Sequence, residues 1–183
     1  MRRSRRRDER LRAWAEELYL RHGPAIAALL GREAAPPIGI EITSGGPWAA
    51  STSGRTVTLN RRWFEEHPDD AGGCLHEFAH AVMEAPGREG ISWLVEGIAD
   101  YVRDVLGFDA PWTTAHFEPG GATAGYQSTA HFLLWLDRRC AGTVTELARR
   151  LSSGRYHPSA FADLCGTSLE ELTAEYEGEH QRG

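Results

Sequence analysis

Cysteine is scarce in this 183-residue chain, and long apolar runs are missing from it. The three cysteines, Cys74, Cys140 and Cys165, show no CxxC spacing, which excludes a secreted disulfide framework and leaves buried thiols as the expectation. No apolar run approaches the roughly 18 residues that a transmembrane helix needs. The segment after the first arginines is too charged for a signal peptide. The sequence therefore predicts a cytoplasmic protein without a membrane partner.

Lysine is absent, and arginine supplies all 20 basic residues. Seven of these arginines lie in residues 1–12 beside only two acidic residues, which gives this segment a net charge of +5 and leaves −11 for the rest. We expect residues 1–10 to form a basic disordered tail and residues 11–183 to form a single domain. A nucleic-acid-binding arginine tail is one possible function, but the acidic body opposes extended phosphate contact, so we expect no nucleic-acid partner.

The apolar pattern predicts a small sheet followed by helices. Residues 38–43 alternate with period two, as in a half-buried strand, and residues 49–60 are typical of a hairpin that turns near Ser53-Gly54. Two N-terminal helices separated at Gly23-Pro24 are expected before the sheet. Later helices are expected over about residues 70–84, 92–106 and 126–140, and after capping boxes at 143–146 and 168–171, with a loop at 108–123. The fold class is α+β: a small N-terminal β-sheet with an edge hairpin, then a mostly helical C-terminal half.

The most informative segment is His76-Glu77-Phe78-Ala79-His80. On a helix, histidines four residues apart share one face, so both imidazoles can reach one metal ion. Glu77 lies beside that face, where its carboxylate can reach a water on the metal. The HExxH pattern alone is a weak signal, and two histidines on a solvated helix face are the alternative interpretation.

A second acidic helix supports the metal site. Glu96 follows His80 by 16 residues, which leaves room for a loop and a return helix, and Asp100 lies one turn further on. Two acids at i and i+4 repel each other unless a positive partner is near. A zinc ion would be the positive partner of Glu96, and a zinc-bound histidine would be the partner of Asp100. We therefore expect Zn²⁺ to be held by His76, His80 and Glu96, with Asp100 behind one of the histidines. The alternative is that Glu96 and Asp100 lie on a solvated helix face, where Arg103 reduces their repulsion.

The HExxH motif followed by Glu-Gly-Ile-Ala-Asp-Tyr-Val-Arg (96–103) resembles the gluzincin arrangement of zinc metallopeptidases. More narrowly, it resembles the basic secretory protein family of peptidases, over about residues 37–178. The likeness includes the hairpin at Thr52-Ser-Gly54 and the pair Gly125-Tyr126. It implies a zincin-like fold, zinc as the metal and peptide-bond hydrolysis. Members of that family are often secreted and basic, so their location and substrates are not carried over to this acidic chain.

Two histidines and one glutamate would leave the fourth zinc position open for water. Zinc lowers the pKa of such a water to about 7, and Glu77 as general base then takes its proton during attack on a peptide carbonyl. Candidates for stabilising the oxyanion are Tyr126 and His116, followed by Tyr101 and His131. The peptide or protein substrate is expected to pair with an edge strand, either Thr56–Leu59 or Ala49–Thr52.

A non-catalytic, zinc-stabilised domain that binds peptides or proteins is the alternative function. Such a structural site has no use for Glu77 as a base, so this residue favours the enzyme. The sequence gives no indication of the oligomeric state.

Overall fold

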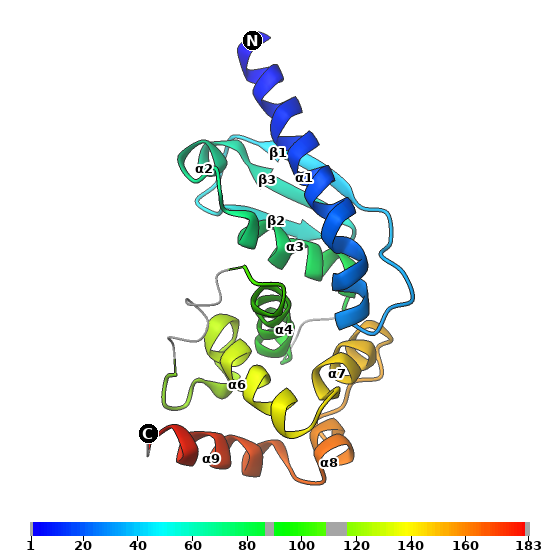
Figure 1. Ribbon diagram of the computed structural model, residues 1–183, viewed down its shortest axis with the longest axis vertical. Helices are drawn as coiled ribbons and strands as arrows, with labels where there is room; N and C mark the ends of the chain where they lie inside the picture. Colours follow the sequence, from blue (N-terminus) through cyan, green and yellow to red (C-terminus); the bar gives the residue numbers. More distant parts are fainter. Residues whose placement is uncertain (1, 87–89, 109–116, 182–183) are drawn as a thin grey trace.

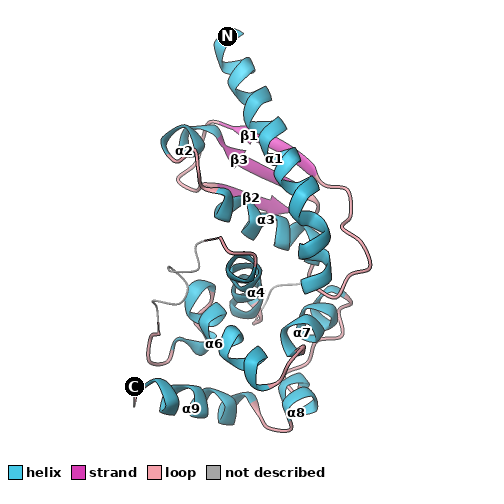
Figure 2. Ribbon diagram, viewed as in Figure 1, coloured by secondary structure: helices cyan, strands magenta, loops and turns pink. Residues whose placement is uncertain are grey.

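The computed structural model describes residues 2–86, 90–108 and 117–181. Its architecture is α+β: three short strands form one small sheet, and most of the remaining chain is helical (Figures 1 and 2). This confirms the predicted fold class at that level. No helix among the described residues is long and apolar enough to cross a membrane.

The sheet has the strand order β1-β3-β2, with β1 at Gly39–Thr43, β2 at Ala50–Ser53 and β3 at Thr56–Asn60. Strands β2 and β3 form the predicted antiparallel hairpin, whereas β1 runs parallel to β3. Because β3 is hydrogen-bonded on both sides, the prediction that Thr56–Leu59 offers a free edge is wrong. Strands β1 and β2 are the two edges of the sheet, and β2 is the edge strand that packs against helix α3 (Figure 1).

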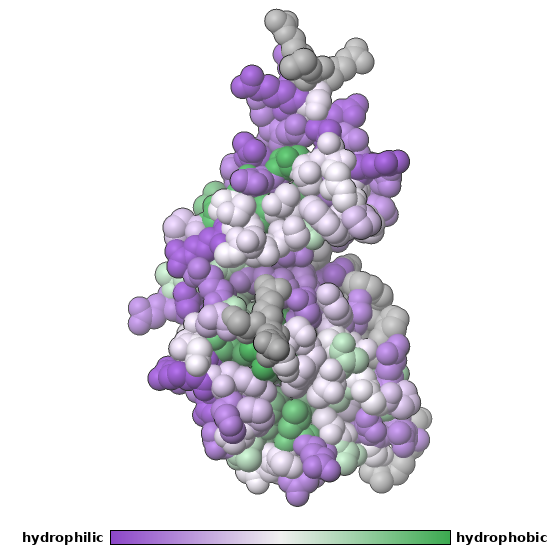
Figure 3. Space-filling view, turned by 180° about the vertical axis from the view of Figure 1, so that it is seen from behind, coloured by the Kyte–Doolittle hydropathy of each residue, from purple (hydrophilic) through white to green (hydrophobic). Residues whose placement is uncertain are grey.

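The N-terminal helix α1 (Arg2–Leu29) is continuous, so neither the predicted disordered tail nor the break at Gly23-Pro24 is found. The apolar residues before and after the proline are buried in one core, at Ala15, Leu18, Tyr19, Ile26 and Ala27. Their packing outweighs the roughly 3 kcal/mol that proline costs inside a helix. Near the start of α1, Asp8 forms an ion pair of 2.6 Å with Arg61. The N-terminal part of α1 projects beyond the sheet, and the part of it that is coloured in Figure 3 is largely hydrophilic (Figures 1 and 3).

The other helices are α2 (Arg61–Glu66), α3 (Ala71–Met83), α4 (Ser92–Val105), the 3-10 turn η1 (Gly121–Thr123), α6 (Tyr126–Arg139), α7 (Thr143–Ser152), α8 (Ala160–Cys165) and α9 (Leu169–His180). The short helices α2 and α8 are not apparent from the periodicity. Ser168 and Glu171 form the predicted capping box of α9. The box predicted for α7 is wrong, because Gly142 is its N-cap and Glu146 pairs instead with the arginines of the same helix.

Helices α3, α4 and α6 pack in succession, and the candidate site lies where α3 faces α4. The N-terminus of α3 is capped by Asp70, whose side chain accepts a hydrogen bond from the Gly73 amide at 2.9 Å. Helix α4 crosses α6 closely at Gly97, where an added Cβ would lie only 2.1 Å from Thr129 Cγ2. Of the three cysteines, which are all free, Cys74 is buried and the other two are half-buried.

Candidate active site

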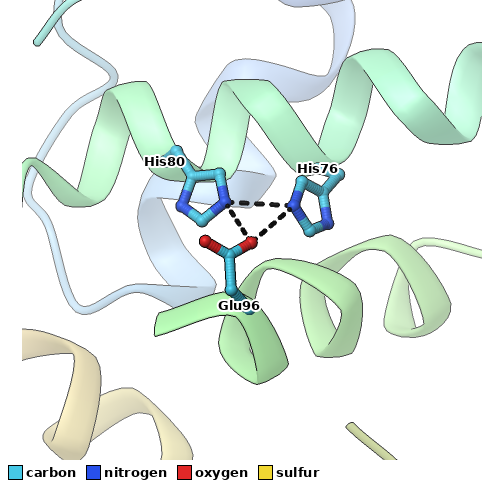
Figure 4. A group of neighbouring side chains, drawn as sticks. All are labelled: His76, His80 and Glu96. Atoms are coloured by element: carbon cyan, nitrogen blue, oxygen red, sulfur yellow. Dashed lines mark hydrogen bonds and ion pairs between the residues drawn. The ribbon is translucent and has the colours of Figure 1, made fainter. Parts of the chain in front are cut away.

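Helices α3 and α4 bring His76, His80 and Glu96 together (Figure 4). The two Nε2 atoms of the histidines lie 3.0 Å apart. Glu96 Oε2 lies 3.2 Å from His76 Nε2 and 3.0 Å from His80 Nε2. Both histidines are buried, and the glutamate side chain is 15% exposed. These three side chains form a group that could hold a metal ion.

The geometry of these donor atoms fits a small divalent cation. Zinc–nitrogen and zinc–oxygen bonds of about 2.0–2.1 Å in a tetrahedral site put neighbouring donor atoms roughly 3.3 Å apart. The observed separations of 3.0–3.2 Å are close to that value. Imidazole nitrogen and carboxylate oxygen are also donor types that zinc accepts.

The charges within the group show why a cation belongs there. Burial lowers the pKa of His76, but its hydrogen bonds to Asp100 and Glu96 raise it more, to about 9. Burial also lowers the pKa of His80, and the proximity of His76 contributes to that shift. The pKa of Glu96 lies well below its usual range, because its hydrogen bonds with the two histidines outweigh the effect of burial. The carboxylate therefore stays ionised and faces a positive charge, which a metal ion would supply in place of a proton.

Asp100 lies behind His76, one turn after Glu96 on α4. Its Oδ1 is 2.7 Å from His76 Nδ1, and the carboxylate is buried. This contact holds the imidazole with Nε2 directed at the group and makes Nε2 a better donor. The guanidinium of Arg103 lies 3.8 Å from the same carboxylate. Nδ1 of His80 is buried and has no hydrogen-bond partner among the described residues, so the two imidazoles are supported differently.

Glu77 is oriented by a residue that sequence reasoning missed. The hydroxyl of Thr52, on the edge strand β2, donates to Glu77 Oε2 at 2.7 Å and lies 3.0 Å from the backbone oxygen of the same residue. The strand thereby holds the carboxylate beside the group that could bind a metal ion. The sequence indicates a hairpin turn at Thr52-Ser-Gly54, but no local pattern relates Thr52 to a glutamate 25 positions later in the chain.

Tyr126 is the candidate for oxyanion stabilisation whose ring contacts this group, among the candidates that the structure describes. Its ring is stacked on that of His76, with centroids 6.1 Å apart and an interplanar angle of 10°. Tyr126 has a φ of +47°, and Gly125 before it has a φ of +94°. A non-glycine residue in the left-handed region costs energy and is found often at functional sites. This conformation directs the first residue of α6 toward α3.

The other described candidates for oxyanion stabilisation, Tyr101 and His131, contact residues outside this group. The hydroxyl of Tyr101 donates to Asp137 at 3.0 Å, which directs it away from the group. The buried His131 contacts the hydroxyl of Tyr176 at 2.6 Å, in a separate aromatic cluster between α6 and α9. Neither residue joins the group of His76, His80 and Glu96. His116 lies outside the described residues.

Two hollows lie on either side of the group along β2. The larger is a cleft of about 750 Å³ that reaches His76 and Glu77 and begins at Ala49 and Ala50. The smaller has a volume of about 360 Å³ and is bordered by His80 and the far end of β2, Thr52–Gly54. The site is thus open to a ligand longer than a single residue. An open position beside three protein ligands is a property of catalytic metal sites rather than structural ones.

Comparison with protein families identifies the class more narrowly. The model of the family described as "Peptidase of plants and bacteria" matches residues 39–176, about three-quarters of the chain. The chain therefore belongs to this family of peptidases, the basic secretory protein family, as the sequence resemblance predicts. Comparisons with curated proteins and with solved structures found no match.

Proposed function

We propose that the protein is a zinc-dependent peptidase of the gluzincin type with a zincin-like fold, formed by one domain. His76, His80 and Glu96 would hold the metal, and Asp100 would orient His76. The observation that carries the proposal is the convergence of two imidazole nitrogens and one carboxylate oxygen within 3.0–3.2 Å of one another, beside an open cleft. The peptidase family supports the reaction class.

The other catalytic roles would be carried out by side chains around the metal. When bound, zinc would polarise a peptide carbonyl and acidify a water molecule. Glu77 would accept the proton of the attacking water and deliver it to the departing amine. The hydrogen bond from Thr52 to Glu77 Oε2 would keep this carboxylate in one orientation through both transfers. Asp100 would keep the His76 imidazole in place by accepting from Nδ1.

The hydroxyl of Tyr126 would stabilise negative charge on the carbonyl oxygen. The stacking of its ring on His76 supports this role. The substrate backbone would pair with the edge strand β2, since this strand lies between the two hollows that flank the group. Such pairing binds extended peptides through main-chain hydrogen bonds and needs little sequence preference.

The proposal is tested by comparing the wild type with Glu77→Gln, which keeps the shape of the side chain and removes the base. We expect one zinc per chain in both proteins, by elemental analysis, and hydrolysis of an unstructured protein such as casein by the wild type alone. Glu66→Gln, a matched change on the exposed face of α2, is the control and should hydrolyse casein at the wild-type rate.

Each other outcome contradicts part of the proposal. Absence of zinc from the wild type would refute the metal site, and retained hydrolysis by Glu77→Gln would refute the assigned base. Zinc in both proteins without hydrolysis by the wild type would instead favour a zinc-stabilised domain that binds peptides.

A further inference from the structure

The larger cleft extends well beyond the metal-binding group. From His76 and Glu77 it continues past Gly73 to Trp63 of α2 and to His67 and Asp69 in the segment between α2 and α3. Gly73 lies one turn before His76 on α3, and a Cβ there would lie 3.1 Å from Asp70 Oδ2. Gly73 therefore borders the cleft without a side chain, next to the carboxylate of Asp70. A substrate extending from the scissile bond in this direction would put a side chain in the outer part of the cleft.

One wall of this outer part is aromatic and held in place. The rings of Trp63 and His67 are stacked, with centroids 4.1 Å apart and an interplanar angle of 19°. The indole Nε1 of Trp63 donates to Asp70 Oδ2 at 2.8 Å, and Asp70 Oδ1 accepts from the amide of Gly73. The indole is therefore fixed relative to α3. A fixed aromatic wall suits the long apolar stem of a side chain and attracts a cationic group at its end.

The same part of the cleft is acidic. Asp69 and Asp70 both border it, and Asp69 is exposed. Among the described residues, no ion pair engages Asp69, whereas Asp100 deeper in the cleft is shared by His76 and Arg103. Arg103, the arginine of the lining, lies 3.8 Å from Asp100 and also interacts electrostatically with Asp70, whereas the charge of Asp69 has no ion-pair partner among the described residues. A ligand with a cationic end would compensate it.

From this arrangement we propose that the outer cleft is a specificity subsite for a basic side chain, arginine or lysine, next to the scissile bond of the substrate. The stem of that side chain lies along Trp63, and its cation lies near Asp69 and Asp70. The net negative charge of the body would in addition attract basic peptides. The inference rests on the proposed peptidase activity, and it adds the class of substrate that the site prefers.

The test uses the zinc-loaded full chain and three fluorogenic decapeptides that differ only at one position. Mass spectrometry of a digested peptide library first identifies the position beside the cleaved bond at which selectivity is greatest. The three peptides then carry arginine, norleucine or glutamate there. We expect kcat/KM for the arginine peptide to exceed that for the norleucine peptide by about tenfold. In Asp69→Asn this ratio should fall severalfold, and Asp69→Lys should cleave the glutamate peptide faster than the wild type does.

Glu66→Lys on the exposed face of α2 is the matched control, because it makes the same charge change outside the cleft and should leave the ratios unchanged. Thermal unfolding of each variant shows whether it is folded. Cleavage without preference for arginine or lysine, or with preference for a large apolar residue, would overturn the subsite. An arginine-to-norleucine ratio of kcat/KM that is equal in the wild type and in a folded Asp69→Lys variant would also overturn the subsite. Failure of the zinc-loaded wild type to cleave any peptide would count against the proposed function instead.

Discussion

The crossing of α4 and α6 at Gly97 allows a prediction worked from distances. A Cβ at this position would lie 2.1 Å from Cγ2 and 2.6 Å from Cβ of Thr129, and Thr129 is fully buried. In Gly97→Ala the helices must therefore separate by roughly 1 Å, because a close-packed interior has no space to absorb the methyl group. Overpacking of this severity costs about 3 kcal/mol, and the better helix propensity of alanine returns about 1 kcal/mol.

We therefore expect Gly97→Ala to lower the free energy of unfolding by about 2 kcal/mol and the Tm by about 4–8 °C. The change should also reduce kcat. The Thr129 hydroxyl accepts from the Gly125 amide at 2.8 Å and donates to the Ala122 oxygen at 3.0 Å, so displacing it displaces Tyr126. A displacement of about 1 Å near the reacting atoms can cost up to a hundredfold.

The assays are urea unfolding followed by tryptophan fluorescence and steady-state hydrolysis. The double variant Gly97→Ala/Thr129→Ser removes the methyl group at 2.1 Å but keeps the hydroxyl, so it should recover part of both losses. A single variant that is as stable as the wild type or more stable, with unchanged kcat, would show that the crossing is not close enough to position Tyr126.

Three further predictions concern other parts of the molecule. Thr52→Val removes the hydrogen bond to Glu77 and should lower kcat about tenfold at unchanged zinc content; an unchanged kcat would refute the orienting role. Asp100→Ala should weaken zinc binding about 10–100-fold, and Glu96→Ala should weaken it more, as measured by chelator competition. A Glu96→Ala variant that binds zinc with wild-type affinity would exclude Glu96 as a ligand. Hydrogen bonds from its arginine partners on α7 hold the pKa of Glu146 at about 2, below its ordinary 4.5, so its stabilising effect is complete above pH 4.5 and is lost as the pH falls through about 2. Glu146→Gln should therefore lower the Tm by about 2 °C at pH 7, and a difference that persists undiminished at pH 2 would contradict this assignment.

Much of the fold follows from local patterns. The period of two in residues 38–43, the hairpin turn near Gly54 and the helical spacing around His76 all correspond to elements of the structure. The exception at Pro24 has a physical reason, because the apolar residues on both sides of it are buried in one core. Packing of both halves of α1 outweighs the local preference for a break. Strand order is also non-local: no periodicity indicates that β3 lies between β1 and β2.

By itself, the sequence indicated the family and the group formed by His76, His80 and Glu96, since the spacing of these residues on two successive helices allows their side chains to meet. Tertiary structure alone decided what surrounds that group. Thr52 reaches Glu77 from a strand 25 residues earlier, and Tyr126 reaches His76 from a helix 50 residues later. Such contacts depend on how sheet and helices pack against one another, and packing is set by complementary shapes of distant segments, which a periodicity within one segment does not record.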